Sequence, residues 1–248
     1  MTDIYLCHAR NTKDPLASYD AAIEENPDNG APPAMGGRTK RSVATFSRLW
    51  ANGRTLKIAF TDDELNESHK QAIIAAIKKW QPYVNLVFEF VDGQEGAAEY
   101  GKGDIRITTH STNNYTLIGT DATLNDPWTP TMVLGIQPAD PTFEAVVMHE
   151  FGHALGAEHE HQHPEAQIPW DIPAVYAHYA AAGHSKEVVD EAVLKKLEKS
   201  QTTYSAYDKN SIMHYPIPNT ITLGDWEVGH NTNISAKDIE LMRKSYPK

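Results

Sequence analysis

Two histidines four residues apart, His149 and His153, stand in the run H-E-F-G-H-A-L-G-A-E-H of residues 149–159. On an α-helix this spacing places both imidazole rings on one face, one turn apart, where they can bind the same metal ion. Zn²⁺ is the usual ion for such nitrogen donors. Glu150 follows the first histidine and would lie beside the metal, where a general base belongs. The pattern therefore predicts one zinc ion with a catalytic carboxylate next to it.

Gly156 and His159 extend this pattern. Glycine readily adopts the left-handed backbone that ends a helix, so we expect a sharp turn at Gly156. That turn would bring His159 beneath the metal as a third ligand. Three neutral histidines leave one tetrahedral position open, which is typical of catalytic zinc sites and not of structural ones. A lone H-E-x-x-H occurs by chance, but the added glycine and third histidine favour a metal site.

Residues 211–215 read S-I-M-H-Y and add a second motif. The zinc-histidine pattern followed by a methionine turn resembles the metzincin metalloproteases. Glu160, directly after the third histidine, makes the chain similar to the astacin family of zinc endopeptidases. The resemblance covers about residues 45–248, and its specific motifs lie in 149–171 and 207–218.

The resemblance to astacins implies a role for three further residues. Met213 would form an apolar floor beneath the metal, although an ordinary core methionine would look similar. Tyr215 would be a fifth, switchable zinc ligand that swings away and donates a hydrogen bond to the developing oxyanion. Glu160 would contact the N-terminus of the mature chain, or else orient His159 or its neighbours. The remaining nearby histidines are interpreted as supporting or surface residues and not as ligands: His161, His163 and His214.

The sequence also departs from the family. Cys7 is the only cysteine, so the chain has no internal disulfide, whereas astacin-like enzymes generally have two. Ala157 replaces the phenylalanine that usually follows the turn glycine. Residues 216–230 contain no arginine or lysine to line a pocket for acidic side chains. The cleavage specificity therefore stays open.

Residues 1–42 are interpreted as a pro-segment-like region and linker. A short helix is expected at 15–25, and a turn-rich stretch and a basic R-T-K-R follow it. Leu49-Trp50 resembles a pair that lies shortly after the mature start in astacins, which places that start near Ser42. In such a segment the Cys7 thiolate is a candidate inhibitory zinc ligand, and an ordinary free cysteine is the alternative.

The rest of the chain predicts an α+β fold of the metzincin type in two subdomains. Residues 43–156 form the N-terminal catalytic subdomain, a twisted mixed sheet with a backing helix and the zinc helix. Residues 157–248 form an irregular, mostly helical C-terminal subdomain with the third zinc ligand and the methionine turn. Apolar patterning predicts strands at 55–60, 85–91, 104–109, 115–120 and 131–136, and helices at 63–80, 143–155, 172–181, 185–199 and 235–244.

One of these strands bears on substrate binding. The segment 115–120 is expected at the edge of the sheet beside the cleft. An extended peptide can pair with such an edge as an additional strand. A loop at 115–120 is the alternative.

The composition limits the partners. The formal net charge of −11 argues against nucleic acid and anionic membranes as partners. No run of about 18 apolar residues predicts membrane insertion, and the first residues lack the pattern of a secretory signal. We therefore expect a protein that stays in the cytoplasm or is secreted by a non-classical route. The sequence does not predict the oligomeric state.

These observations predict a zinc-dependent endopeptidase that hydrolyses protein or peptide bonds with zinc-activated water, Glu150 being the general base. Two alternatives stay open. A zinc amidase would act on a non-protein amide with the same metal site. A catalytically silent zinc-binding module would grip a partner along the cleft, but such a module would not need Glu150.

Overall fold

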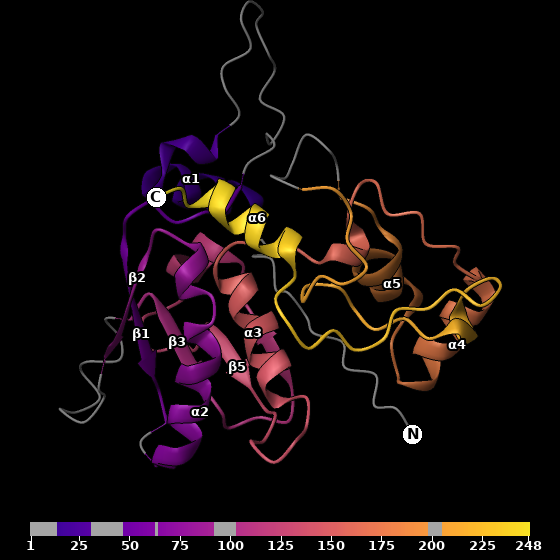
Figure 1. Ribbon diagram of the computed structural model, residues 1–248, viewed down its shortest axis with the longest axis horizontal. Helices are drawn as coiled ribbons and strands as arrows, with labels where there is room; N and C mark the ends of the chain where they lie inside the picture. The colour runs from indigo at the N-terminus through magenta and orange to yellow at the C-terminus, as the bar shows by residue number, and fades with distance from the viewer. Residues whose placement is uncertain (1–13, 31–46, 63, 92–102, 198–204) are drawn as a thin grey trace, which may run out of the picture.

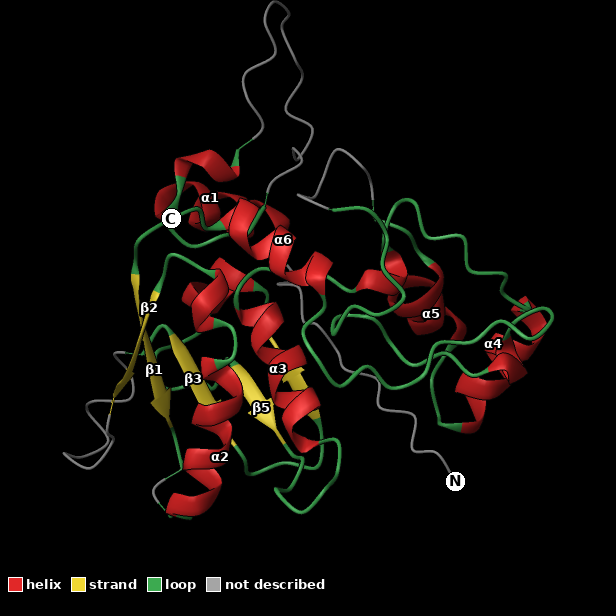
Figure 2. Ribbon diagram, viewed as in Figure 1, coloured by secondary structure: helices red, strands yellow, loops and turns green. Residues whose placement is uncertain are grey.

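The computed structural model describes residues 14–30, 47–62, 64–91, 103–197 and 205–248, which form two parts side by side (Figure 1). All the strands drawn in Figure 2 lie in the left-hand part, while helices and loops make up the right-hand part. The structure thus has the mixed sheet and helices of the predicted α+β fold, while the division of the chain after residue 156 stays a prediction. No helix among the described residues is long and apolar enough to cross a membrane.

A five-stranded mixed sheet forms the N-terminal subdomain, in the order β2-β1-β3-β5-β4. Its strands are β1 (Thr55–Phe60), β2 (Val87–Val91), β3 (Ile105–Thr108), β4 (Asn114–Thr116) and β5 (Met132–Leu134). The pairs β1·β2, β1·β3 and β3·β5 are parallel, and β4 is antiparallel to β5 at the sheet edge. In β1, Leu56 and Ile58 are buried while Thr55 and Lys57 are exposed, which is the alternation that predicted this strand.

Two helices, α2 (Glu67–Lys78) and α3 (Phe143–Ala154), cover the near face of this sheet in Figure 1. The Asn66 side chain caps α2 by accepting from two backbone N–H groups of its first turn. Fully buried side chains from α2, α3 and the central strands form the main hydrophobic core. The Trp80 indole lies between the helices and donates to the carbonyl of Met148 in α3 (3.0 Å). This core holds the zinc helix in a fixed position against the sheet.

The C-terminal subdomain contains α4 (Ile172–Ala181), α5 (Lys186–Val189), a π-helical turn (Asp190–Leu194) and α6 (Ala236–Ser245). A separate small core, which includes Val175, Tyr179 and Val193, packs α4 against the π-helical turn. The predicted capping box begins α6, since Ser235 and Asp238 bond each other's backbone N–H groups. The last helix then packs back on the first subdomain.

Near the N-terminus, α1 (Pro15–Glu25) and a short 3₁₀ turn (Pro27–Asn29) pack against the segment that leads to Trp50. The helix has the predicted bounds. The Asn29 side chain is buried and bonds both the N–H (2.9 Å) and the carbonyl (2.7 Å) of Leu49. The division at residue 42 stays a prediction, because residues 31–46 lie outside the described residues.

Most predicted elements lie within about two residues of the observed bounds, but three differ by more. The helix expected at 63–80 begins at Glu67, after its Asn66 cap. The strand expected at 115–120 ends at Thr116, because Gly119 has a φ of 48° and starts a 3₁₀ helix. The helix expected to reach residue 199 ends at Leu194, where the chain becomes extended so that the Leu197 N–H can donate to the Gln162 carbonyl (2.7 Å).

Candidate metal centre

The helix α3 carries His149, Glu150 and His153 and is buried on nearly all sides. Its apolar residues face the sheet and α2, and its interior position explains why its sequence shows little polar patterning. The first turn is preceded by Asp140, whose carboxylate accepts from the Thr142 N–H (2.8 Å) and hydroxyl (2.7 Å). Rigid packing of this helix fixes the direction of the two histidines.

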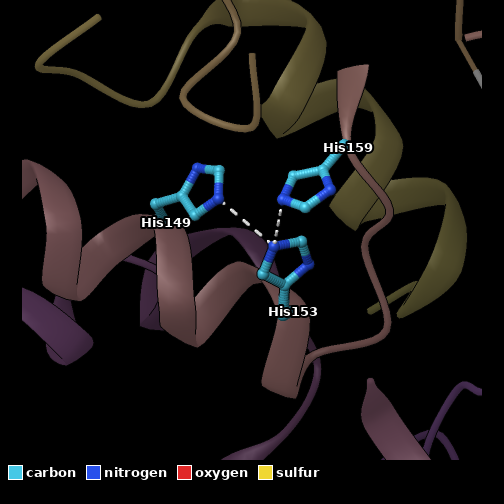
Figure 3. Close-up of side chains that lie close together, drawn as sticks. All are labelled: His149, His153 and His159. Carbon is cyan, nitrogen blue, oxygen red and sulfur yellow. Dashed lines mark hydrogen bonds between the residues drawn. The ribbon is translucent and has the colours of Figure 1, made fainter. Parts of the chain in front are cut away.

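The Nε2 atoms of His149, His153 and His159 converge on one point (Figure 3). The Nε2 of His153 lies 3.2 Å from that of His149 and 3.0 Å from that of His159, and all three atoms lie within 4.8 Å of one another. Two nitrogens bound to one tetrahedral zinc at its usual bond length are about 3.3 Å apart. The observed spacing of His153 to its neighbours therefore matches a shared zinc ion.

The other ring nitrogens fix the tautomers of the two helix histidines. The Nδ1 of His149 donates to the carbonyl of Ile212 (2.7 Å), and that of His153 donates to the carbonyl of Ala157 (2.7 Å). A carbonyl only accepts, so Nδ1 carries the proton and Nε2 presents a lone pair. Burial lowers the pKa of His149 to about 4 and that of His153 well below its usual value. Facing lone pairs on neutral rings need a cation between them, so this donor set fits zinc.

The turn after α3 brings in the third histidine as predicted. Gly156 has a φ of 94°, in the left-handed region, and a Cβ there would lie 3.1 Å from the Arg48 carbonyl. Its N–H donates to the His153 carbonyl (2.8 Å) and closes the helix. The Arg48 guanidinium pairs with Glu158 (2.8 Å), the residue before His159, and so ties this turn to the first subdomain.

The methionine turn fastens both halves of the metal site. The Ile212 carbonyl accepts from His149, and the Met213 carbonyl accepts from the Glu160 N–H (3.0 Å). Asp238 stabilises the turn, because its carboxylate accepts from the Ser211 hydroxyl (2.6 Å) and the Ile212 N–H (2.9 Å). The sequence predicted Asp238 only as a helix cap, and its second function of holding this turn has no signal in the sequence.

The Met213 side chain is buried and packs directly on α3. A Cβ added to Gly152 would lie 2.4 Å from its sulfur and 3.4 Å from Trp80. Gly152 is therefore the place where the zinc helix admits the methionine side chain, which agrees with the expected apolar floor. Sequence analysis did not single out this glycine, although its position between the two zinc histidines, inside a helix, was a usable signal.

Glu150 is fully buried next to the converging histidines. The hydroxyl of Thr116, in the edge strand β4, donates to its Oε2 (2.8 Å). The edge strand therefore contacts the carboxylate that was predicted as the general base. Sequence analysis missed Thr116, because nothing in the sequence links a threonine to a carboxylate 34 residues later.

Tyr215 is also buried, and its ring lies against the rings of His159 (centroids 4.3 Å apart) and His161 (4.2 Å apart). The phenol is thus beside the metal site. His161 and His163, interpreted as supporting or surface residues, are both buried and bond backbone carbonyls through Nε2. His214 bonds locally, donating from Nδ1 to the Tyr215 carbonyl (2.7 Å) and accepting from Tyr207 at Nε2 (2.9 Å).

Glu160 lies behind the metal site and lines a pocket together with Ser47, Leu49, His163 and other residues. Its Oε1 accepts from the Asp208 N–H (2.7 Å). Burial, together with the nearby carboxylates of Asp238 and Asp208, raises the pKa of Glu160 to about 8. A buried carboxylate of this kind can take a cationic partner.

Comparison with known proteins supplies the family. The model of the astacin peptidase family matches residues 42–247. The chain belongs to the astacin family. It is therefore a zinc metalloendopeptidase, and its three converging histidines form a group that can bind the single catalytic zinc of that family. None of the curated proteins compared with the chain matches it.

Solved structures agree with this astacin assignment. One structure of myroilysin is 34% identical, with a TM-score of 0.75, and the match covers 83% of this chain and 98% of myroilysin. A crystal structure of myroilysin is 33% identical, with a TM-score of 0.60, and covers 90% and 96%. High choriolytic enzyme 1, a hatching-enzyme zinc protease of the medaka Oryzias latipes, is 16% identical (TM-score 0.54; 84% and 97%) and supports the fold.

Proposed function

We propose that this astacin cleaves peptide bonds within proteins, with Glu150 as the general base. The observation that carries the proposal is the position of the Glu150 carboxylate, fully buried beside three converging imidazoles and held at one oxygen by Thr116. A carboxylate with no metal chemistry to perform would face solvent on a helix surface. Its burial beside the histidines supports a role in accepting a proton from the reacting water.

The catalytic steps follow from the residues that surround the reacting bond. Zinc, when bound, supplies a Lewis acid that polarises the scissile carbonyl and makes water more acidic. Glu150 takes the proton of the attacking water and later passes it to the leaving amine. The Thr116 hydroxyl donates to Oε2 of Glu150 and would thereby orient the carboxylate for both transfers.

The edge strand β4 is the proposed binding site for the backbone of the substrate. It pairs with β5 on one side, and no strand among the described residues pairs with its other side. An extended peptide that adds along this edge forms backbone hydrogen bonds in the manner of another strand. Thr116 belongs to β4 and contacts Glu150, so such a peptide would pass beside the general base.

Tyr215 is the proposed switchable fifth ligand and oxyanion donor. Its buried ring against His159 supports this role, and removing such a donor typically slows turnover about 100-fold or more. Glu160 is the proposed contact for a mature N-terminus, and its pocket includes Ser47, close to the predicted start near Ser42. The inhibitory role proposed for Cys7 stays a prediction, since residues 1–13 lie outside the described residues.

One set of assays distinguishes the endopeptidase from the amidase and from the catalytically silent binding module. The change is Glu150→Gln, which keeps the size and the acceptor for Thr116 but cannot take a proton. We expect wild type to cleave casein and unblocked peptides, chelator to abolish this, and Glu150→Gln to retain stoichiometric zinc while losing activity by about 1,000-fold. Thr116→Val, which removes only the orienting hydroxyl, is the matched milder change.

A wild-type protein with stoichiometric zinc that cleaves no protein or peptide would favour the silent binding module. Cleavage of small amides without cleavage of peptides would favour the amidase. Equal activity of Glu150→Gln and wild type would remove Glu150 from the mechanism.

A further inference from the structure

A buried histidine that the mechanism does not use lies against Tyr215. The rings of His161 and Tyr215 are stacked, with centroids 4.2 Å apart and an angle of 18° between their planes. The phenol ring also lies tilted against the His159 ring, at a centroid distance of 4.3 Å and an angle of 54°. The Tyr215 ring therefore packs against both a predicted zinc ligand and a histidine that is not one, and those two histidine rings contact each other as well (centroids 5.3 Å apart).

His161 is itself fixed from the C-terminal subdomain. Its Nε2–H donates to the Ala192 carbonyl (3.0 Å), in the π-helical turn Asp190–Leu194. The next residue strengthens this anchor, because the Gln162 amide donates to the Glu191 (2.8 Å) and Lys195 (3.1 Å) carbonyls. Carbonyls at the end of a helix lack intrahelical partners and are open to such bonds. The π-helical turn thus sets where the His161 ring lies.

The surroundings of the second ring nitrogen indicate that His161 acts by stacking its ring on Tyr215 and not by transferring a proton. Because Nε2 faces a carbonyl and carries the proton, Nδ1 is a bare acceptor. That Nδ1 is buried and has no hydrogen-bond partner among the described residues. A neutral ring stacks on a phenol without competing for the metal.

We propose that His161 is a positioning residue for Tyr215, and that its stacked ring keeps the phenol seated beside the zinc histidines. The inference rests on the proposed role of Tyr215 in catalysis. It adds a link from the π-helical turn, through His161, to the reacting groups. It also gives a role to an imidazole whose Nδ1 has no hydrogen-bond partner in the part of the chain that the structure describes.

Two substitutions distinguish the effect of the His161 ring from the effect of its hydrogen bond to the Ala192 carbonyl. His161→Gln keeps a donor that can reach the Ala192 carbonyl but removes the ring, whereas His161→Phe keeps a flat ring but removes the donor. Displacing a catalytic group by about 1 Å can cost up to 100-fold in rate, so we expect His161→Gln to lower kcat about tenfold with KM within about twofold. His161→Phe should stay within about threefold of wild type, and zinc should stay stoichiometric in both. If His161→Gln keeps full kcat while His161→Phe loses it, only the hydrogen bond to the Ala192 carbonyl matters, and the proposal is overturned.

Tyr215→Phe supplies the test of coupling. If His161 acts through the phenol, His161→Gln should lower kcat by less than about twofold once the hydroxyl is gone. An equal loss in both backgrounds would overturn the proposal. His163→Gln is the matched control, because His163 is equally buried and also bonds a carbonyl, but its ring faces Tyr207 (centroids 6.0 Å apart).

A readout without catalysis keeps this inference separate from the proposed function. The protein is labelled with 3-fluorotyrosine and treated with chelator, and the Tyr215 fluorine resonance is identified by its loss in Tyr215→Phe. We expect His161→Gln to shift that resonance, because a parallel ring is removed, and His163→Gln to leave it in place. An unshifted resonance would overturn the positioning role. A shifted resonance with full kcat in Tyr215→Phe would instead refute the catalytic role of Tyr215.

Discussion

Among single residues, Gly152 is where the zinc helix and the methionine turn come closest. Alanine would favour the helix by about 1 kcal/mol, but its Cβ would lie 2.4 Å from the Met213 sulfur. The methionine must then move, and its turn bonds both His149 and Glu160. We expect Gly152→Ala to lower the free energy of unfolding by about 1–3 kcal/mol and to weaken zinc binding about tenfold, as measured by denaturant titration and by competition with a chelator.

Two further variants test the cause of that loss. Gly229→Ala is the control, since a Cβ at Gly229 meets nothing within 4 Å. In a Met213→Ala background the clash is gone, so Gly152→Ala should there cost little or become stabilising. A loss of the same size in that background would show that the Met213 contact is not the reason.

At the same scale, the sequence predicted the zinc residues because each has a fixed spacing along the chain. His149 and His153 follow the helical repeat, and Gly156 is needed for a left-handed turn. Thr116 and Asp238 could not be found in this way. Thr116 contacts Glu150, and Asp238 contacts the methionine turn, only in the folded chain. Local sequence patterns do not predict contacts between residues so far apart in the sequence.

At the scale of elements, Asn29 is one of the residues that join α1 and the turn after it to the catalytic subdomain, in addition to Ser18 and Glu25. The buried Asn29 amide donates to the carbonyls of Ala22 (2.8 Å) and Leu49 (2.7 Å), and its Oδ1 accepts from the Leu49 N–H (2.9 Å) and the Ser47 hydroxyl (2.8 Å). Asn29→Ala removes all four bonds, and only the Ala22 carbonyl keeps another partner in the described part of the chain, the Asn26 N–H (2.9 Å). We expect it to lower the free energy of unfolding of the full chain by about 2–4 kcal/mol, measured in urea.

The control for this prediction is Asp28→Ala, since Asp28 is the exposed neighbour of Asn29 in the same turn. It should change the free energy of unfolding by less than about 0.5 kcal/mol. Equal midpoints for the Asn29 variant and wild type would mean that the four Asn29 bonds do not contribute to stability.

Elements with a clear repeat were predicted well, and elements that end for tertiary reasons were not. The strand β1 and the helices α1 and α4 have the predicted bounds. The helix beginning at Lys186 was expected to continue to 199 because Leu197 extends its apolar stripe. It ends at Leu194 instead, because Gln162 takes the backbone carbonyls and the N–H group that follow. The hydrogen bonds of Gln162, and not the helix propensity of the segment, determine where this helix ends.

For the whole molecule, stability should depend on pH through buried histidines. Burial lowers the pKa of His214 to about 4 and that of His161 to about 3, so both are neutral in the fold. In the unfolded chain the pKa of histidine returns to about 6.5. As the pH falls from about 6.5 towards 4, the unfolded state therefore binds more protons, and the free energy of unfolding decreases.

Glu160 acts in the opposite direction. Its pKa is raised to about 8 in the fold, against about 4.3 in an unfolded chain. Between these values the folded state binds more protons, so its contribution to stability is lost as the pH rises towards 8. Burial also raises the pKa of Glu158 and Asp238. The chelated protein has neutral His149 and His153 with lowered pKa values as well, so four histidines oppose these three carboxyl groups. We expect the urea midpoint of the chelated protein to fall between about pH 7 and pH 5.

His214→Gln tests the source of this dependence. Glutamine can keep an acceptor for the Tyr207 hydroxyl and a donor for the Tyr215 carbonyl, the two bonds that His214 makes, but it does not titrate. The variant should therefore show a shallower fall of the midpoint with acid than wild type. His230→Gln is the exposed counterpart and should leave the slope unchanged. A wild-type midpoint that stays constant from about pH 7 to pH 5 would mean that the buried histidines do not control the acid stability of this enzyme.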